Sequence, residues 1–234
     1  MPPSPRSLAP AAIAAACGLA AFATACGDDG DAAADAAPDA PTDAAACPQV
    51  WTVVADPGTA ATIAGGALVL TGANLTGSAL EVHRDGLTGD FEVGFDVESF
   101  GAGATGAFLQ AAISEPVAQP ARFLSTAIGT HPVVGVSAAD QPAGATDLAA
   151  TAATAATLRF ARTGTTVTLT ATAGAATATV TAADFATQPL RVGVQLGSNL
   201  GTVAPATTAR LSAFVVTSGA GVTADAFDCD SLIP

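Results

Sequence analysis

Three carboxylates alternate along one short segment, Phe91–Glu98, and are the side chains best placed to do chemistry. If the segment is a strand, Glu92, Asp96 and Glu98 share one face, and the Cβ atoms of the last two lie roughly 6–7 Å apart. Paired carboxylates near that separation can hydrolyse glycosidic bonds, one as the acid and the other as base or nucleophile. A solvated strand face is the simpler interpretation. We therefore treat the three as a candidate ligand face and assign no catalytic residue.

Other chemically active residue types are scarce. His83 and His131 have no His, Cys or Glu at ligand spacing, so we predict no zinc site. The segment Asp85–Asp90 could offer oxygen ligands to Ca²⁺, but it fits no calcium-loop pattern and reads more simply as a Gly/Asp turn. We predict no cofactor. Trp51, the single tryptophan of a chain without tyrosine, is either a core residue or a platform for a sugar ring.

The first 25 residues read as a secretory signal peptide. Arg6 precedes an uncharged, alanine-rich run, Leu8–Ala25, that ends in small residues. The run ends in Ala-Thr-Ala before Cys26 and Gly27, which resembles the lipobox of bacterial lipoproteins, with Ala23 where that family usually has Leu. The resemblance implies that Cys26 is acylated and anchors the protein in a lipid bilayer.

Two alternatives to this anchor stay open. An ordinary signal peptidase could cut after Ala25 and leave Cys26 as a free thiol, and acylation could instead fall on Cys17. If Cys26 is acylated, Gly27 in place of Asp indicates an outer-membrane or cell-surface location by enterobacterial sorting logic. We therefore expect a lipid-anchored protein of the cell envelope.

Residues 26–46 contain the acylated cysteine and an Ala/Asp/Pro segment with six Asp and no aromatic residue. A segment of this composition cannot bury enough apolar surface to fold, so we predict a disordered tether. The whole chain has 20 acidic residues against 7 basic ones, a formal net charge of −13. This balance disfavours nucleic acid and anionic membrane surfaces as partners.

Residues 47–234 are predicted to form one β-rich domain, because short alternating runs separated by Gly, Pro and Asn dominate and helix signals are nearly absent. In the clearest run, Phe91–Glu98, the side chains of Phe91, Val93, Phe95 and Val97 should face the core. Residues 157–181 indicate a three-stranded meander with turns at Thr163-Gly164 and Ala173-Gly174. Later strands are expected at Leu190–Leu196 and Arg210–Val216, and a long loop at Gln141–Ala156.

Four short segments resemble concanavalin A-like lectin/glucanase jelly rolls. They are Leu87–Val93, Leu158–Gly164, Arg191–Val194 and Leu211–Val216, and the resemblance covers most of residues 50–216. It implies a two-sheet antiparallel jelly-roll sandwich whose first and last strands are adjacent. That adjacency would bring together Cys47 and Cys229, which bracket everything that looks folded, and is consistent with a disulfide between them.

The function expected from the sequence is a binding or adhesion module that holds glycan or an envelope protein at the cell surface. Two alternatives remain: a structural envelope lipoprotein without a small ligand, and a glycoside hydrolase that uses Glu92, Asp96 or Glu98. Laminarinase-type enzymes with this fold carry Glu-x-Asp-x-x-Glu. Because these three carboxylates are spaced by four and two residues, they do not match it, and we do not expect an enzyme.

Overall fold

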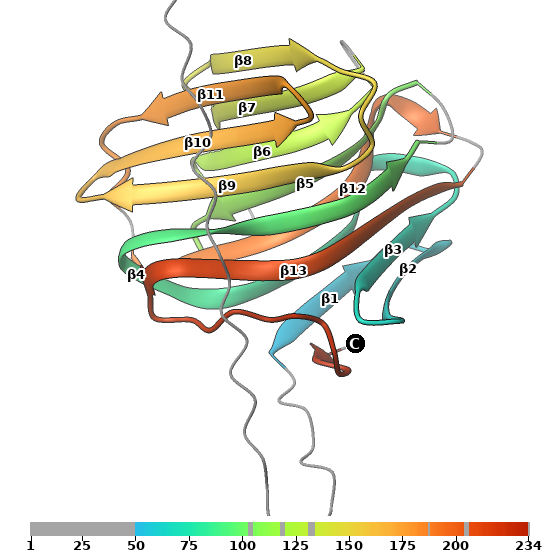
Figure 1. The fold of residues 1–234 in the computed structure, drawn as a ribbon, viewed down its shortest axis with the longest axis horizontal. Helices are drawn as coiled ribbons and strands as arrows, with labels where there is room; N and C mark the ends of the chain where they lie inside the picture. The colour runs from blue at the N-terminus through green and yellow to red at the C-terminus, as the bar shows by residue number, and fades with distance from the viewer. Residues whose placement is uncertain are drawn as a thin grey trace, which may run out of the picture. The chain divides into compact units, whose positions relative to one another are not determined.

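One long strand, β4 (Leu75–Gly101), runs through both sheets of the domain and bends between them (Figure 1). The bend falls at Gly86 and Gly89, whose φ angles of 103° and 68° are readily adopted only by glycine. The turn that we predict at Asp85–Asp90 is therefore wrong. The chain does not reverse there, because both halves of β4 have partner strands that keep it extended.

The computed structural model describes residues 50–102, 105–117, 120–130, 134–186, 188–203 and 206–233. Over these residues the domain contains fourteen strands and no helix. The described part thus has no helix that could span a membrane. The signal peptide, the tether, Cys17, Cys26, Cys47 and His131 lie outside the described residues.

The strands form two sheets that share β4. Sheet A runs in the order β14 (Leu232–Ile233), β1 (Trp51–Ala55), first half of β4, β12 (Leu190–Val203), β5 (Ala107–Ser114), β6 (Phe123–Gly129), β7 (Gly135–Gln141) and β8 (Ala145–Ala150). Sheet B runs in the order β2 (Thr59–Ile63), β3 (Leu68–Gly72), β13 (Thr207–Ala220), second half of β4, β9 (Ala156–Thr163), β10 (Thr166–Ala173) and β11 (Ala176–Ala182). Neighbouring strands are antiparallel except β1 and β14.

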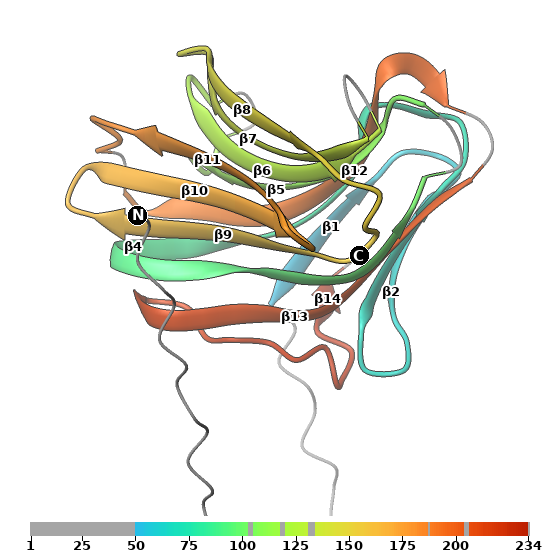
Figure 2. The ribbon, with the colours of Figure 1, turned by 45° about the horizontal axis from the view of Figure 1, so that its top comes forward.

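The two sheets pack face to face, and β10 and β11 lie against β6, β7 and β8 (Figure 2). The side chains of Phe91, Val93, Phe95 and Val97 are all buried, as their alternation predicts. Burial of each large apolar side chain contributes about 1.5–3 kcal/mol, so these alternating rows supply much of the stability of the sandwich. The predicted all-β, two-sheet jelly-roll architecture is confirmed.

The predicted meander is present as β9, β10 and β11, with Gly164 and Gly174 in the two turns, each at a φ of 59°. The loop predicted at Gln141–Ala156 is wrong, because it contains β8, which pairs with β7. Leu148 is the one large apolar residue of β8, so the period-two signal was too weak to reveal it. Backbone pairing with β7, rather than burial of apolar side chains, stabilises β8. In addition, Asp147 Oδ2 accepts a hydrogen bond from Thr179 N of β11 at 2.7 Å.

Trp51 is a core residue rather than a sugar platform, since its side chain is fully buried among three phenylalanine rings. Its Nε1 donates to Asp225 Oδ2 at 2.8 Å, which ties β1 to the C-terminal segment. The first strand, β1, pairs with the last, β14, as the jelly-roll resemblance implies. Cys229 is disulfide-bonded. Because Cys47 is outside the described residues, its pairing with Cys229 stays a prediction.

Candidate functional site

The three carboxylates of the predicted ligand face lie together on the outer face of sheet B. Asp96 forms an ion pair with Arg159 of β9, and Glu98 Oε2 accepts from Arg210 Nε of β13 at 2.6 Å. Glu92 is exposed. Exposed pairs of this kind contribute about 0–1 kcal/mol, so the arrangement is that of a charged, solvated strand surface.

A second set of alternating polar residues, not among the predicted site residues, lies on the outer face of sheet A. The side chains of Glu81, His83 and Asp85 point outward from β4. Leu80, which precedes Glu81, and Val82, which lies between Glu81 and His83, are fully buried. The signal was available, because Glu-x-His-x-Asp has the same period of two as the segment that we favoured. These residues form a cluster because the neighbouring strand β12 places Arg191 beside them.

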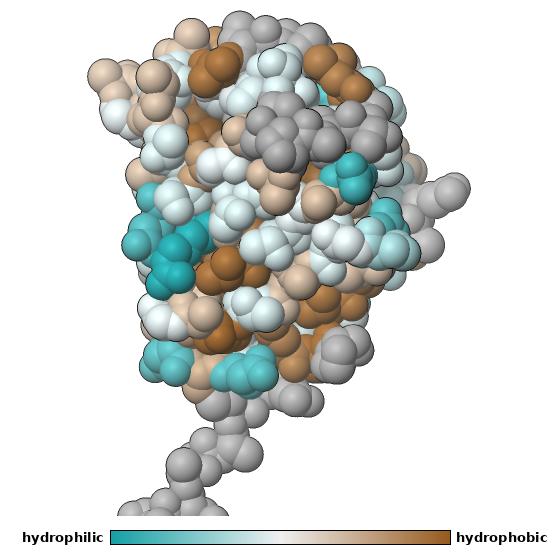
Figure 3. Space-filling view, turned by 90° about the vertical axis from the view of Figure 1, so that its right-hand side faces the viewer, coloured by the Kyte–Doolittle hydropathy of each residue, from teal (hydrophilic) through white to brown (hydrophobic). Residues whose placement is uncertain are grey.

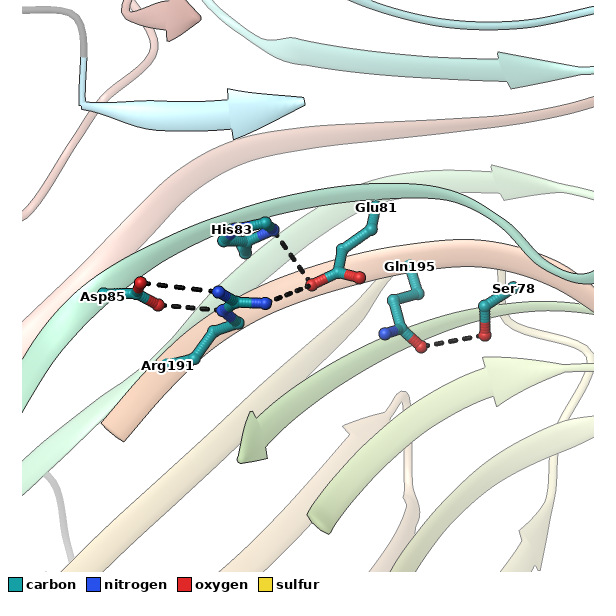
Figure 4. Close-up of polar contacts among 6 residues, drawn as sticks. All are labelled: Ser78, Glu81, His83, Asp85, Arg191 and Gln195. Carbon is teal, nitrogen blue, oxygen red and sulfur yellow. Dashed lines mark hydrogen bonds and ion pairs between the residues drawn. The ribbon is translucent and has the colours of Figure 1, made fainter. Parts of the chain in front are cut away.

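Arg191 of β12 lies opposite Asp85 and joins the two carboxylates of β4 (Figure 4). Its Nε donates to Asp85 Oδ1 at 2.8 Å, and its Nη1 lies 3.9 Å from Glu81 Oε1. The Asp85 carboxylate raises the pKa of the Arg191 guanidinium through this hydrogen bond. Arg191 thus occupies the region between the carboxyl groups as a fixed cation.

His83 fits beneath this cluster because the residue opposite it is Gly193. A Cβ at Gly193 would lie 2.7 Å from His83 Cβ, closer than side chains tolerate. The His83 Nδ1 atom lies 3.0 Å from Glu81 Oε1 but lacks hydrogen-bond geometry, so we treat the contact as electrostatic. The pKa of Glu81 is lowered by this contact first, and then by Arg191 and Gln195, against the opposing effect of burial.

Beyond the cluster, small and polar side chains cover the outer face of sheet A. The strand registers align them in rows that cross β12, β5, β6 and β7: Gly193, Ala112, Ser125 and Ala139 in one row, and Gln195, Gln110, Ala127 and Ser137 in the next. Larger side chains flank the two rows, with Phe123 on one side and Phe108 on the other. Short residues in the middle of a sheet leave a hollow above them.

Two adjacent hollows lie over these rows and together form what we call the trough. The first, of 230 Å³, adjoins Glu81, Arg191 and Gln195, and the second, of 190 Å³, lies over Gln110 and Ser125. From β4 to β8 the sheet is six strands wide, so the trough can extend about 24 Å at ~4.8 Å per strand spacing. This length suits an extended ligand better than a compact one.

The trough is rich in side chains that can form hydrogen bonds. Its hydroxyl and amide groups can donate and accept hydrogen bonds, as the 3.0 Å bond from Ser78 Oγ to Gln195 Oε1 illustrates. A general acid for glycoside cleavage needs a raised pKa, whereas that of Glu81 is lowered. Among the described residues no group of three or more His, Cys, Asp or Glu could hold a metal ion.

Comparison with known proteins supports the fold and leaves the activity open. No protein-family model matches the chain, and no curated protein matches it in sequence. A solved structure, a glycoside hydrolase family 16 endo-glucanase from Bacteroides ovatus in complex with G4G3G-2F-DNP, matches with a TM-score of 0.51 and 11% identity. The match covers 72% of this chain and 94% of that one. At this identity the likeness establishes the jelly-roll fold alone.

Proposed function

We propose that this chain is a cell-envelope lipoprotein whose jelly-roll domain binds neutral glycan chains in the trough of sheet A without cleaving them. The observation that carries the proposal is the position of Arg191 between Glu81 and Asp85, at one end of an otherwise uncharged polar trough. A glycan presents hydroxyl groups along an extended chain, and such a chain fits a long hollow lined by Ser and Gln.

The charge of the protein favours a neutral ligand. The formal net charge of the chain is −13, and the one arginine that lines the first hollow, Arg191, already contacts two carboxylates. A polyanion would meet repulsion, and the described lining of the two hollows contains no second cation to offset it. An uncharged polysaccharide meets neither obstacle.

The N-terminal segment supports an envelope location. A lipobox-like Cys26 and an acidic spacer of some twenty residues would hold the domain outside the lipid headgroups, since a flexible coil of that length averages about 25 Å end to end. A tether of this kind lets one domain reach polymers around the cell. Binding such polymers requires no catalytic step.

Glycoside hydrolysis is the second candidate, and one observation favours it: Glu81 and Asp85 share a strand face four residues apart in a fold that an endo-glucanase also has. The segment reads Glu81-Val82-His83-Arg84-Asp85, which departs from Glu-x-Asp-x-x-Glu at its second and third acidic positions. The pKa of Glu81 is lowered, first by His83 and then by Arg191, which does not suit a proton donor.

The decisive experiment is a glycan array with the full chain and two variants. Ala112→Trp would fill the floor of the trough, while Ala161→Trp makes the same change on the outer face of sheet B. We expect binding to neutral polysaccharides, a loss of tenfold or more in Ala112→Trp, no change in Ala161→Trp, and no release of reducing sugar. Equal binding by both variants would place the ligand elsewhere, and sugar release lost in Glu81→Gln would favour the hydrolase.

A further inference from the structure

The strand β2 forms an open edge of sheet B. It pairs with β3 on one side, and within the described residues no strand pairs with it on the other. Among the described strands, the other edges differ from β2: β8 carries the charge of Asp147, the backbone of β11 donates a hydrogen bond to that carboxylate from Thr179 N, and β14 has two residues. The sequence of β2, TAATI, has no charge and no proline, the devices by which proteins usually block strand addition.

The hydrogen-bonding pattern identifies which backbone groups of β2 face outward. Ala73 N donates to Gly58 O at 3.2 Å and Ala64 N donates to Ala67 O at 2.9 Å, so the pairs at both ends of the ladder are hydrogen-bonded. Antiparallel pairing alternates between bonded and non-bonded pairs. The even-numbered residues therefore turn toward β3, and Ala61 and Ile63 present their N–H and C=O groups to the open side.

An apolar slot runs along the same edge. Its volume is 390 Å³, and it lies between β2 and the β1–β14 edge of sheet A, lined by Val53, Ala61, Thr62, Ile63, Asp230 and Leu232. Figure 3 views the side of the domain where β2 lies, and apolar side chains gather in the lower half of that face. A strand added to β2 would place alternate side chains in this slot.

Asp230 adds a charge preference at the slot. Its Oδ1 accepts a bond from Leu232 N at 3.3 Å, and none of the ion pairs among the described residues includes it. A basic side chain on a bound segment would neutralise this carboxylate. A second copy of the same chain would instead bring another acidic protein, with a net charge of −13.

We propose that the β2 edge binds an extended peptide segment of a partner protein, which adds as a strand beside Ala61 and Ile63. One apolar side chain of the segment enters the slot against Val53 and Leu232, and a basic side chain lies next to Asp230. Backbone hydrogen bonds provide the affinity in this mode of recognition, and the slot and the carboxylate provide the specificity. The slot shares no lining residue with the trough, so peptide binding at β2 can be tested independently of glycan binding.

The test uses a synthetic peptide, acetyl-Thr-Ile-Thr-Ile-Thr-Lys-amide, and the full chain. We expect the amide hydrogens of Ala61 and Ile63 to exchange at least tenfold more slowly when the peptide is bound. Ala61→Pro removes one outward N–H without breaking a bond to β3, and should abolish binding. Asp230→Asn should weaken binding about threefold or more. Ala60→Ser, at an exposed position of β2 outside the slot lining, should leave binding unchanged.

Peptide controls separate the alternatives. Proline in place of the second Thr of the peptide should reduce binding, as Ala61→Pro does in the protein. Glu in place of Lys should also reduce binding, as Asp230→Asn does. Protection that appears at trough residues instead of Ala61 and Ile63 would overturn the proposal, as would equal affinity for the Lys and Glu peptides. A dimer in sedimentation that Ala61→Pro abolishes would assign the edge to a second copy.

Discussion

Arg191 of β12 lies directly opposite Asp85 of β4, and its guanidinium bonds the Asp85 carboxylate at 2.8 Å. The same side chain reaches toward Glu81, so one arginine contacts both carboxylates at the end of the trough. This ion-pair geometry supports the binding proposal over hydrolysis, because the pKa of Glu81 is lowered and a general acid for glycoside cleavage needs a raised pKa.

The ionisation of Glu81 can be measured by pH titration. Its pKa is lowered below 4.5 by His83 and Arg191, so its contribution to stability is present above about pH 4.5 and is lost as pH falls through the folded-state pKa. We expect Arg191→Gln to raise the Glu81 midpoint toward 4.5, but not to reach it, because His83 remains. Carboxyl carbon NMR gives the midpoint directly. A midpoint that does not move in the variant would show that Arg191 has no role in it.

Gly193 is expected to tolerate no side chain. In Gly193→Ala the new Cβ would lie 2.7 Å from both His83 Cβ and Val82 O, so we expect a loss of about 1–3 kcal/mol in the free energy of unfolding. Gly101→Ala is the matched control, since its Cβ would have no neighbour nearer than 3.8 Å. Urea denaturation compares the two. Equal stability of both variants would mean that β4 and β12 can separate at this point.

Asp225 should hold the C-terminal segment against the core. Its carboxylate accepts bonds from Trp51 Nε1, Phe227 N and Ser231 Oγ at 2.8, 2.8 and 3.0 Å. Asp225→Ala leaves these donors unpaired, and we expect a cost of about 2–4 kcal/mol. The exposed Asp228→Ala should change stability by less than about 0.5 kcal/mol. Fluorescence of the single tryptophan follows both unfolding curves, and coincident curves would contradict the assignment.

A disulfide between Cys47 and Cys229 should appear in non-reducing peptide mapping as one cross-linked pair. Closing a loop of that length stabilises by up to ~5 kcal/mol in the chain-entropy model, so reduction should lower the midpoint of urea unfolding clearly. Recovery of Cys47 as a free thiol from envelope-derived protein would rule the pairing out.

Lipid attachment at Cys26 should be visible as palmitate labelling and partition into the detergent phase. Both should disappear in Cys26→Ala, because no other cysteine follows a lipobox-like sequence at the end of the apolar run. Labelling that persists in this variant would transfer the anchor to Cys17.

Local patterns in the sequence were sufficient for most of the strands. Alternation in Phe91–Glu98 identified the buried side chains correctly, and glycines marked both turns of the meander, because strand periodicity and turn conformation depend on residues close in the chain. The bend in β4 was missed because it depends on hydrogen bonds to the distant strands β12 and β13. The edge strand β8 was missed because Leu148 is its one large apolar residue, although its partner β7 is close in the chain.

The candidate sites depended on tertiary structure for the same reason. Glu81, His83 and Asp85 could be placed on one strand face from the sequence alone. Only strand pairing could place Arg191 beside Asp85, 106 residues away, and Gly193 opposite His83. Which strands become neighbours is decided by the packing of the whole sandwich, and a period of two records only which face a side chain occupies. The sequence thus determined the faces, and the fold decided what each face meets.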